Sequence, residues 1–434
     1  MKLKDKLSRL TSPGPRTVPA LVTPSLEREA PAEQRVHALR SMLGQMMTRD
    51  LKREPVPAAS VSRVHELPGQ VRETEHGRVR FVERFCEPAH CHGRVPVSHA
   101  LRADSSLVAK LALDPAFENV DMRGMLLIDT ETTGLAGGSG TIPFLIGMAW
   151  FEDESLRVQQ LFLERPGEEA PMLREAAARM TKATCIVSYN GKSFDWPLLR
   201  TRYVLNRVAV PAPPPHLDLL HCARRVFKRS MPGMRLQHLE REVLGLYRED
   251  DIDGSQIPAA YLSFLRGIDA SRIAAVIEHN GSDLIALAAV LVALGERFHE
   301  VRSSDDPREH LSLAHLAMRA DDGDRAWKFA RAASTGGMDA VAAEAYALLA
   351  HLSKEKGDDA GAGEALRTAL THCNNDEERE GTIHLALAKL YEHRLKNYAL
   401  ALVHAAQATN AEGEEASRKR VARLQKRTSQ SALL

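Results

Sequence analysis

Long apolar runs are scarce in this 434-residue chain, and cysteine is rare. No apolar run approaches the roughly 18–20 residues of a membrane span, and the first residues lack the apolar core of a signal peptide. The 5 cysteines are odd in number and scattered, which fits a reducing compartment better than a disulfide framework. We therefore expect a cytoplasmic protein that does not associate with membranes.

Aromatic residues and net charge are also low. Phe, Trp and Tyr make up 5% of the chain, which argues against broad base-stacking platforms of the kind that single-strand-binding proteins use. With 58 Lys and Arg against 57 Asp and Glu, the total charge gives no support for a nucleic-acid partner. A local basic groove remains possible on this composition, so evidence for such a partner must come from individual residues.

The length predicts two to three domains, because a single core rarely grows past about 250–300 residues. Residues 1–76 are rich in Pro, Arg and Glu and are expected to be largely flexible, apart from a possible helix at 32–52. Residues 77–120 are expected to form a β lead-in segment that begins with an alternating strand. Its Cys86, His90, Cys91, His92 and His99 lack paired C-x-x-C spacing, so a hairpin with incidental His and Cys is favoured over a zinc site.

Residues 126–135, LLIDTETTGL, predict a buried strand that carries Asp129 and Glu131 on one face at its end. Paired carboxylates repel each other unless cations or protons neutralise them, and hard oxygen ligands suit Mg²⁺ or Mn²⁺. An exposed acidic strand end is the alternative.

Residues 142–151 predict a central strand, and residues 157–164 predict its antiparallel neighbour. The glycines at 137–140, which follow the strand that carries Asp129, lack the Lys-Ser/Thr of a phosphate-binding loop.

Two later segments carry further acidic residues. Residues 185–188 predict a short strand, and Asp195 begins the helix that follows the next turn, where an Asp is commonly only an N-cap. His279 and Asp283 share a face if residues 277–298 form a helix, so that Asp283 adds a fourth carboxylate and His279 a candidate general base. The alternative is an Asn-Gly-Ser turn at 280–282 with Asp283 capping the last helix.

Taken together, these segments resemble the DEDD exonucleases of the RNase H-like superfamily, and within it the YprB-like RNase H-like domain family. The motifs that carry the resemblance are IDTETTGL at 128–135, YNGKSFD at 189–195, HLDLLH at 216–221, LER at 239–241, DGSQIP at 253–258 and HNGSD at 279–283. The resemblance covers residues of about 120 to 300. It implies an RNase H-like mixed β-sheet flanked by helices, in a domain at 121–302, and a 3′-to-5′ exonuclease-like site.

The resemblance also implies roles for individual residues. Asp129, Glu131, Asp195 and Asp283 would bind two divalent cations, Mg²⁺ or Mn²⁺, and His279 would activate the attacking water. His279 stands four residues before Asp283, whereas His-type members usually have five, so the geometry of the base departs from the family pattern. Substrate-binding or supporting roles are expected for Asn190, Lys192, Asp218 and Thr132. Phe194 and Trp196 flank Asp195 and could stack on a terminal base, although Phe194 is expected in the core.

Nearby basic residues add positive charge that could contact phosphates, although a solvated basic face is an equal alternative for each one. They are Lys192, Arg200, Arg202, Arg224, Arg225, Lys228, Arg229 and Arg235.

From residue 308 to 412 the chain is alanine-rich and reads as helix, turn and helix, three times over. Gly323-Asp324 and Gly357-Asp358 mark turns that are 34 residues apart, as in tetratricopeptide repeats. An ordinary helical bundle is the alternative. Residues 413–434 are expected to form a basic flexible tail.

The sequence therefore favours a metal-dependent nuclease, acting on DNA or RNA, with a helical-repeat module that binds a protein. The neighbourhood of the family suggests a helicase as that partner. The alternative is an inactive nucleic-acid-binding or scaffold protein that uses both parts for assembly. Several points stay open at this stage. They are whether the substrate is DNA or RNA and single-stranded or duplex, and, beyond the resemblance, whether the enzyme is an exonuclease or an endonuclease. The metal and the oligomeric state are open as well.

Overall fold

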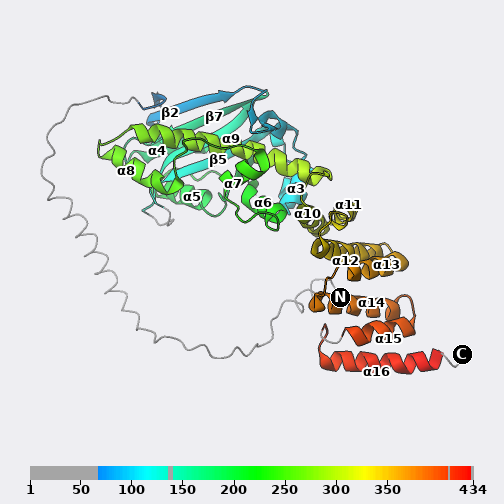
Figure 1. The fold of residues 1–434 in the computed structure, drawn as a ribbon. Helices are drawn as coiled ribbons and strands as arrows, with labels where there is room; N and C mark the ends of the chain where they lie inside the picture. Colours follow the sequence, from blue (N-terminus) through cyan, green and yellow to red (C-terminus); the bar gives the residue numbers. More distant parts are fainter. Residues whose placement is uncertain (1–66, 135–139, 409–410, 432–434) are drawn as a thin grey trace, which may run out of the picture. The chain divides into compact units, whose positions relative to one another are not determined.

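The structure, a computed structural model, describes residues 67–134, 140–408 and 411–431. Its centre is a seven-stranded mixed sheet in the order β1-β2-β7-β6-β5-β8-β9 (Figure 1). The strands are β1 (Gln70–Thr74), β2 (Gly77–Cys86), β5 (Met125–Thr132), β6 (Pro143–Glu152), β7 (Ser155–Phe162), β8 (Cys185–Ser188) and β9 (His216–Asp218). The pairs β5/β8 and β8/β9 are parallel, and the other pairs are antiparallel. The mixed sheet expected from the sequence is present.

Strand β5 lies inside the sheet, between β6 and β8, because its first half is apolar on both faces. Leu127 packs in one hydrophobic core, whereas Leu126 and Ile128 pack in the other. From Asp129 onward the residues of the strand are partly buried; Asp129 pairs with Gly147 of β6, and the register shifts between Glu131 and Thr132. The strand therefore delivers its carboxylates at the point where regular pairing breaks down.

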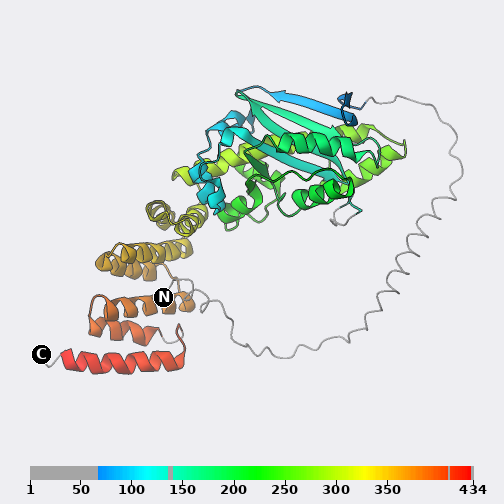
Figure 2. The ribbon, with the colours of Figure 1, turned by 180° about the vertical axis from the view of Figure 1, so that it is seen from behind.

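Helices cover both faces of this sheet. The long helix α9 crosses one face in Figure 1, and Figure 2, from behind, shows α4 and α5 over the other. The helices of this part are α3 (Ser105–Ala112), α4 (Glu169–Met180), α5 (Asp195–Leu205), α6 (Leu219–Phe227), α7 (Leu236–Leu239), α8 (Ile257–Leu265) and α9 (Ser271–His299). Shorter elements are the strands β3 (Cys91–His92) and β4 (Val95–Pro96), the 3-10 turns η1 (Val97–Arg102), η2 (Pro115–Phe117), η3 (Met122–Gly124) and η5 (Gly254–Gln256), and the π-helical η4 (Glu240–Leu244).

Helix α9 runs without a break through Asn280, Gly281 and Ser282, so the alternative of a turn at this place is wrong. It is also long and apolar enough to cross a membrane by length and composition, contrary to the expectation that no segment approaches a span. However, 78% of its most apolar stretch of 18 residues is buried inside the protein. Its apolar character therefore fits the central helix of the domain core.

The rest of the described chain is all-helical. Its helices are α10 (Pro307–Arg319), α11 (Gly323–Ser334), α12 (Asp339–Glu355), α13 (Asp359–Thr371), α14 (Glu377–His393), α15 (Tyr398–Gln407) and α16 (Glu414–Ser431). Side-chain caps recur where these helices begin, since Asp322, Asp358 and Asn397 each accept a hydrogen bond from the backbone N–H three residues on. Three successive helix–turn–helix units lie where the sequence predicted them.

Several local expectations were wrong. Strand β1 falls inside the segment expected to be flexible, and β2 belongs to the main sheet because it pairs with β7. The expected tail forms helix α16, whose Leu424 is buried and whose Arg420 and Arg423 pair with the buried Glu392. The possible helix at 32–52 and most of the glycine turn at 137–140 lie outside the described residues.

Candidate active site

Four acidic side chains from three elements meet at the end of β5. Asp129 and Glu131 come from β5, Asp195 is the first residue of α5, and Asp283 lies on α9. Hydrogen bonds tie these elements together at the carboxylates: the Thr130 hydroxyl donates to Asp195 Oδ1 at 2.5 Å, and Asn280 Nδ2 donates to Asp129 Oδ2 at 2.7 Å. Asp195 is therefore held by β5 and does not act as a simple N-cap.

Asn280 is fixed in turn by the sheet. Its Oδ1 accepts a hydrogen bond of 2.8 Å from Gln160 Nε2 of β7, and the same Gln160 nitrogen donates to the backbone oxygen of Ile277 at 2.7 Å. A Cβ atom on Gly147 would lie 2.2 Å from Asn280 Oδ1, so only a glycine fits on β6 at this place. The bare backbone of Gly147 lets α9 approach the sheet closely enough for Asn280 to reach Asp129.

The electrostatics of these carboxylates reflect their crowding. Burial raises the pKa of Asp129 well above its usual range, and Asp283, Glu131 and Asp195 raise it further. Burial and the charges of Asp283 and Asp195 do the same to the pKa of Glu131. Burial raises the pKa of Asp195 to about 6 against the hydrogen bond from Thr130. The site thus holds an excess of negative charge, which protons or cations would relieve.

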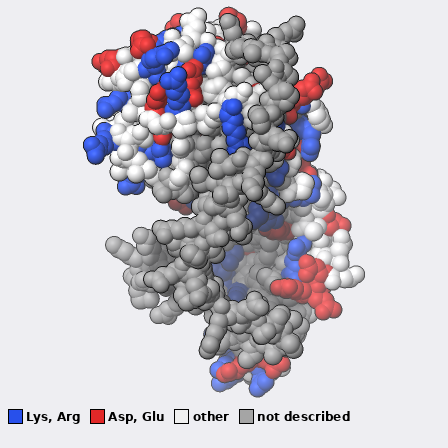
Figure 3. All heavy atoms as spheres, turned by 90° about the vertical axis from the view of Figure 1, so that its left-hand side faces the viewer, with Lys and Arg blue, Asp and Glu red and all other residues white. Residues whose placement is uncertain are grey.

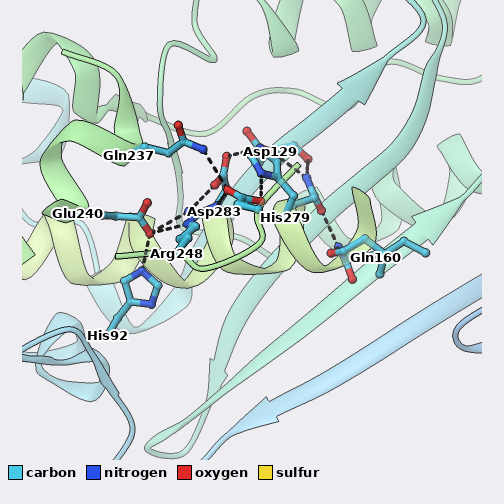
Figure 4. A network of polar contacts seen from close by, with 11 residues as sticks. His92, Asp129, Gln160, Gln237, Glu240, Arg248, His279 and Asp283 are labelled. Carbon is cyan, nitrogen blue, oxygen red and sulfur yellow. Dashed lines mark hydrogen bonds and ion pairs between the residues drawn. The ribbon is translucent and has the colours of Figure 1, made fainter. Parts of the chain in front are cut away.

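A guanidinium group lies on one side of this cluster (Figure 4). Arg248 Nη2 is 2.5 Å from Asp283 Oδ1 and 2.8 Å from Oε1 of the buried Glu240, and Nη1 is 3.3 Å from Asp251 Oδ2. Burial raises the pKa of Asp283, whereas Arg248 and His279 lower it. Asp283 is consequently the one member of the cluster that has a cationic partner within the described part of the chain.

His279 lies on the same face of α9 as Asp283, as its spacing predicted. Its Nδ1 is 2.7 Å from Asp251 Oδ1, and its Nε2 is 3.7 Å from Asp283 Oδ2. An ionised carboxylate only accepts hydrogen bonds, so in the neutral form of the ring Nδ1 carries the proton and Nε2 keeps its lone pair. Despite burial, the hydrogen bond from His279 and the charges of His279 and Arg248 keep the pKa of Asp251 below its usual value. The arrangement leaves the ring nitrogen nearest the carboxylates able to accept a proton.

Asp218, which the sequence placed among the supporting residues, is buried behind the turn that leads to Asp195. Its carboxylate accepts hydrogen bonds from the backbone N–H of Asn190 at 2.8 Å, of Lys192 at 3.2 Å and of Leu220 at 3.1 Å. Asn190 adopts a left-handed conformation with φ of 68°, and its carbonyl oxygen accepts from the N–H groups of Ser193 and Phe194. Asp218 and Asn190 therefore shape the turn through the backbone.

The other predicted contacts lie further out. Lys192 Nζ is 3.9 Å from Asp114 Oδ2, and the hydroxyl of Thr132 donates to the backbone oxygen of Gly134. Phe194, expected in the core, is instead 57% exposed beside Asp195, because it precedes α5 and faces outward from the turn. Trp196 is partly buried against the core beneath α5.

The expected basic face is partly used for internal contacts. Arg202 forms a two-point ion pair with Glu169, and Arg229 forms one with Glu344 of α12 at 2.8 and 2.9 Å. Figure 3 shows Lys and Arg interspersed with Asp and Glu on the visible part of one face. Arg200, Arg224, Lys228 and Arg235 are exposed.

The cysteines and histidines near residue 90 do not converge. His92 is buried and its Nε2 lies 2.7 Å from Glu240 Oε1, whereas Cys86 is buried and Cys91 is exposed. Across the residues that the structure describes, no group of three or more His, Cys, Asp or Glu side chains already surrounds a point where a metal could sit. That holds for the zinc alternative and for the carboxylates around Asp129.

The donor set at Asp129 nevertheless fits a hard divalent cation. All four acidic side chains offer oxygen, the ligand that Mg²⁺ and Mn²⁺ prefer. The raised pKa values of Asp129 and Glu131 arise from burial and from like charges, and a cation would remove the second cause. The carboxylates would need to close around the ion, since Asp283 is engaged by Arg248 and Asp129 by Asn280.

The sequence analysis missed four members of this network. Arg248 and Asp251 lie in the irregular segment between η4 and η5, Glu240 begins a π-helical turn, and Asn280 follows His279 on α9. Periodicity carries no signal in an irregular segment. For Arg248 and Asp251 the available clue was the density of charged residues from Arg248 to Asp253, which ordinarily indicates an exposed loop. Glu240 and Asn280 lie in the motifs LER and HNGSD, but no role in orienting the acidic residues was assigned to them.

Comparison with known proteins agrees with this architecture. Residues 126–295 match the model of the RNase H superfamily, which suggests a nuclease-like function. The uncharacterized protein YprB of Bacillus subtilis strain 168 is 31% identical over 284 residues, which make up 64% of this chain and 67% of that protein. The chain belongs to the YprB family and contains an RNase H superfamily domain.

Proposed function

We propose that this protein is a metal-dependent nuclease that hydrolyses phosphodiester bonds of DNA or RNA from the 3′ end. The observation that carries the proposal is the gathering of four acidic side chains beside His279. They are Asp129, Glu131, Asp195 and Asp283, and the Nδ1 atom of His279 is held by Asp251, which leaves Nε2 to accept a proton. Carboxylates that repel one another at a strand end give a folded protein no stability, so their presence together fits a cation-binding role.

The four acidic residues would hold two divalent cations, Mg²⁺ or Mn²⁺. Such cations polarise the scissile phosphate, lower the pKa of water and stabilise the leaving oxygen. The protein's own part is to present the oxygens in fixed positions. Thr130 fixes one oxygen of Asp195 and Asn280 one oxygen of Asp129, so the other oxygen of each carboxylate can turn toward an ion.

His279 would act as the general base in this scheme. Its Nδ1 proton is held by Asp251, and the same carboxylate stabilises the ring after Nε2 has taken a proton from water. The Nε2 atom faces Asp283, so the proton would be removed at the edge of the carboxylate cluster.

Substrate contacts would come from exposed side chains beside Asp195. Phe194 can stack on a terminal base whatever its identity, and Lys192 and the exposed arginines can contact phosphates. Sequence selectivity would then be slight. We also propose that residues 121–302, together with β1 and β2 of the same sheet, form the nuclease part, and that residues 308–412, continued by α16, form the helical part.

The helical part would serve as a protein-binding module. The three helix pairs of residues 308–412 are proposed to be tetratricopeptide-like repeats. Their proposed partner is a helicase, and the proposed location of the protein is the cytoplasm. Their support is the succession of three helix pairs and the recurring Asp and Asn caps, although the second helices of the pairs begin at Gly323, Asp359 and Tyr398 and are therefore not evenly spaced.

The nuclease proposal is tested with single-stranded DNA and RNA, labelled at the 3′ or the 5′ end, in Mg²⁺, Mn²⁺ or EDTA. We expect shortening from the 3′ end that requires the metal and disappears in Asp129→Asn and His279→Ala. Asp324→Asn is the matched control, because the Asp324 side chain is 86% exposed on α11. Intact substrate in every metal, with all variants alike, would instead support the scaffold alternative.

A further inference from the structure

Arg248 is the cation at the centre of the network in Figure 4, and its side chain is only 11% exposed. It contacts Asp283 at 2.5 Å, Glu240 at 2.8 Å and Asp251 at 3.3 Å. Glu240 is 1% exposed and is also held by His92. The guanidinium group thus joins a carboxylate of the candidate active site to a buried acid outside it.

The charge of Arg248 is permanent. Burial alone would lower its pKa, but the carboxylates of Asp283 and Glu240 raise it above the usual value. An arginine in this position neutralises part of the negative charge in the absence of metal, and it does so at Asp283, one of the carboxylates proposed to bind a cation. Among the described residues, the side-chain donors at Asp129 and Asp195 are the neutral Asn280 and Thr130.

We propose that Arg248 is an internal counter-cation, which holds Asp283 while the site is free of metal and competes with the divalent cations for that carboxylate. The proposal rests on the proposed nuclease function, because it assumes that Asp283 binds a metal. Arg248 is a positioning residue, since it acts through Asp283 and through the Asp251–His279 pair. It limits the strength of metal binding when no substrate is present.

This role predicts the sign of two changes in metal affinity. Removing the positive charge of Arg248 leaves Asp283 free and the site more negative, so a divalent cation should bind more tightly. Glu240 and Asp283 share the guanidinium group of Arg248. Neutralising Glu240 should therefore let Arg248 hold Asp283 more firmly, so that the divalent cation binds more weakly. A purely structural role predicts weaker binding in both cases, because any loosening of the site separates the ligands.

The experiment is calorimetric titration of Mn²⁺ into the full-length, EDTA-treated protein at pH 7.5 without nucleic acid. The variants are Arg248→Gln, Arg248→Lys and Glu240→Gln, and circular dichroism and the melting temperature verify that each is folded. We expect the Kd to fall about tenfold in Arg248→Gln, to stay within about twofold in Arg248→Lys, which keeps the charge, and to rise about threefold in Glu240→Gln.

A Kd in folded Arg248→Gln that equals or exceeds that of the wild type would overturn the proposal. If Arg248→Gln does not fold, Arg248→Met, which also removes the charge, is titrated in its place, and a Kd in that folded variant that equals or exceeds that of the wild type would overturn the proposal. Wild-type protein that takes up no Mn²⁺ would overturn the metal mechanism and this inference together. Measurable Mn²⁺ binding whose Kd does not change as expected in the Arg248 variants would overturn this inference alone.

Discussion

The Nδ1 atom of His279 lies 2.7 Å from Oδ1 of Asp251, a residue 28 positions earlier in the chain. The contact joins the core helix α9 to an irregular segment, and it fixes which ring nitrogen faces the carboxylates. Gln237 also donates to Asp251 at 3.0 Å, so the carboxylate that orients the histidine is itself held. A base positioned in this way is ready before substrate arrives.

Replacing Asp251 by Asn should therefore lower kcat about hundredfold and leave KM nearly unchanged, because the ring loses the charge that stabilises its protonated form. Single-turnover cleavage in Mg²⁺ measures the effect. The matched control is Asp250→Asn at the neighbouring exposed acid, where φ is 57° and Asn is well tolerated. Equal losses in both variants would mean that general negative charge matters here, and not the contact with His279.

A glycine pair tests how closely α9 must approach the sheet. In Gly147→Ala the new Cβ would lie 2.2 Å from Asn280 Oδ1 and 2.8 Å from Leu284 Cδ1, so we expect the free energy of unfolding to fall by about 2 kcal/mol or more, with loss of activity. In Gly281→Ala the new Cβ meets Gln160 at 3.7 Å, an ordinary contact, and α9 should gain up to about 1 kcal/mol. Urea unfolding of both variants measures the difference, and a destabilised Gly281→Ala would contradict the packing described here.

Metal should raise the stability of the protein at neutral pH. Cations at the four carboxylates relieve repulsion that the metal-free fold must bear, and a ligand at about 100 times its Kd adds about 2.7 kcal/mol. We expect Mn²⁺ to raise the melting temperature relative to EDTA, and Asp129→Asn to reduce that rise. A rise of equal size in Asp129→Asn would place the binding elsewhere.

Glu344 makes stability depend on pH at a place remote from the candidate active site. Hydrogen bonds from His315 and Arg229 lower its pKa to about 2, against the opposing effect of burial. Because the folded-state pKa lies below the usual value of 4.5, the stabilisation is complete above about pH 4.5 and is lost as the pH falls toward 2.

The variant Glu344→Gln isolates this effect. We expect it to cost about 1 kcal/mol at pH 7 and progressively less below pH 4, as measured by urea unfolding of both proteins across the range. The Glu344 side chain is 33% exposed, so solvent weakens the pair. A cost that stays constant down to pH 3 would show that packing, and not charge, is lost in the variant.

The sequence predicted those parts of the fold that have a period or a fixed spacing. Alternation and apolar runs located β5, β6 and β7, and the spacing of His279 and Asp283 placed both on one face of α9. The contacts that orient the acidic residues were not predictable in this way. Arg248 and Asp251 belong to a charged segment without regular structure, and such a segment looks like an exposed loop until its partners are known.

The errors have similar causes. Residues 417–427 have the composition of a flexible tail, but Arg420 and Arg423 find a buried partner in Glu392, which no local pattern indicates. Phe194 was expected in the core because of its apolar ring, yet its backbone position before α5 turns it outward. A tertiary contact decided the first case, and the local backbone decided the second.

The fit between Gly147 and Asn280 also predicts how the two positions can change in evolution. Any side chain larger than hydrogen at 147 occupies the place of the Asn280 amide oxygen. Relatives that keep Asn at the position of Asn280 should therefore keep Gly at the position of Gly147, and relatives with a larger residue at 147 should have lost the Asn. Such paired variation in an alignment would mark which members of the family still hold the acid at position 129 in the same way.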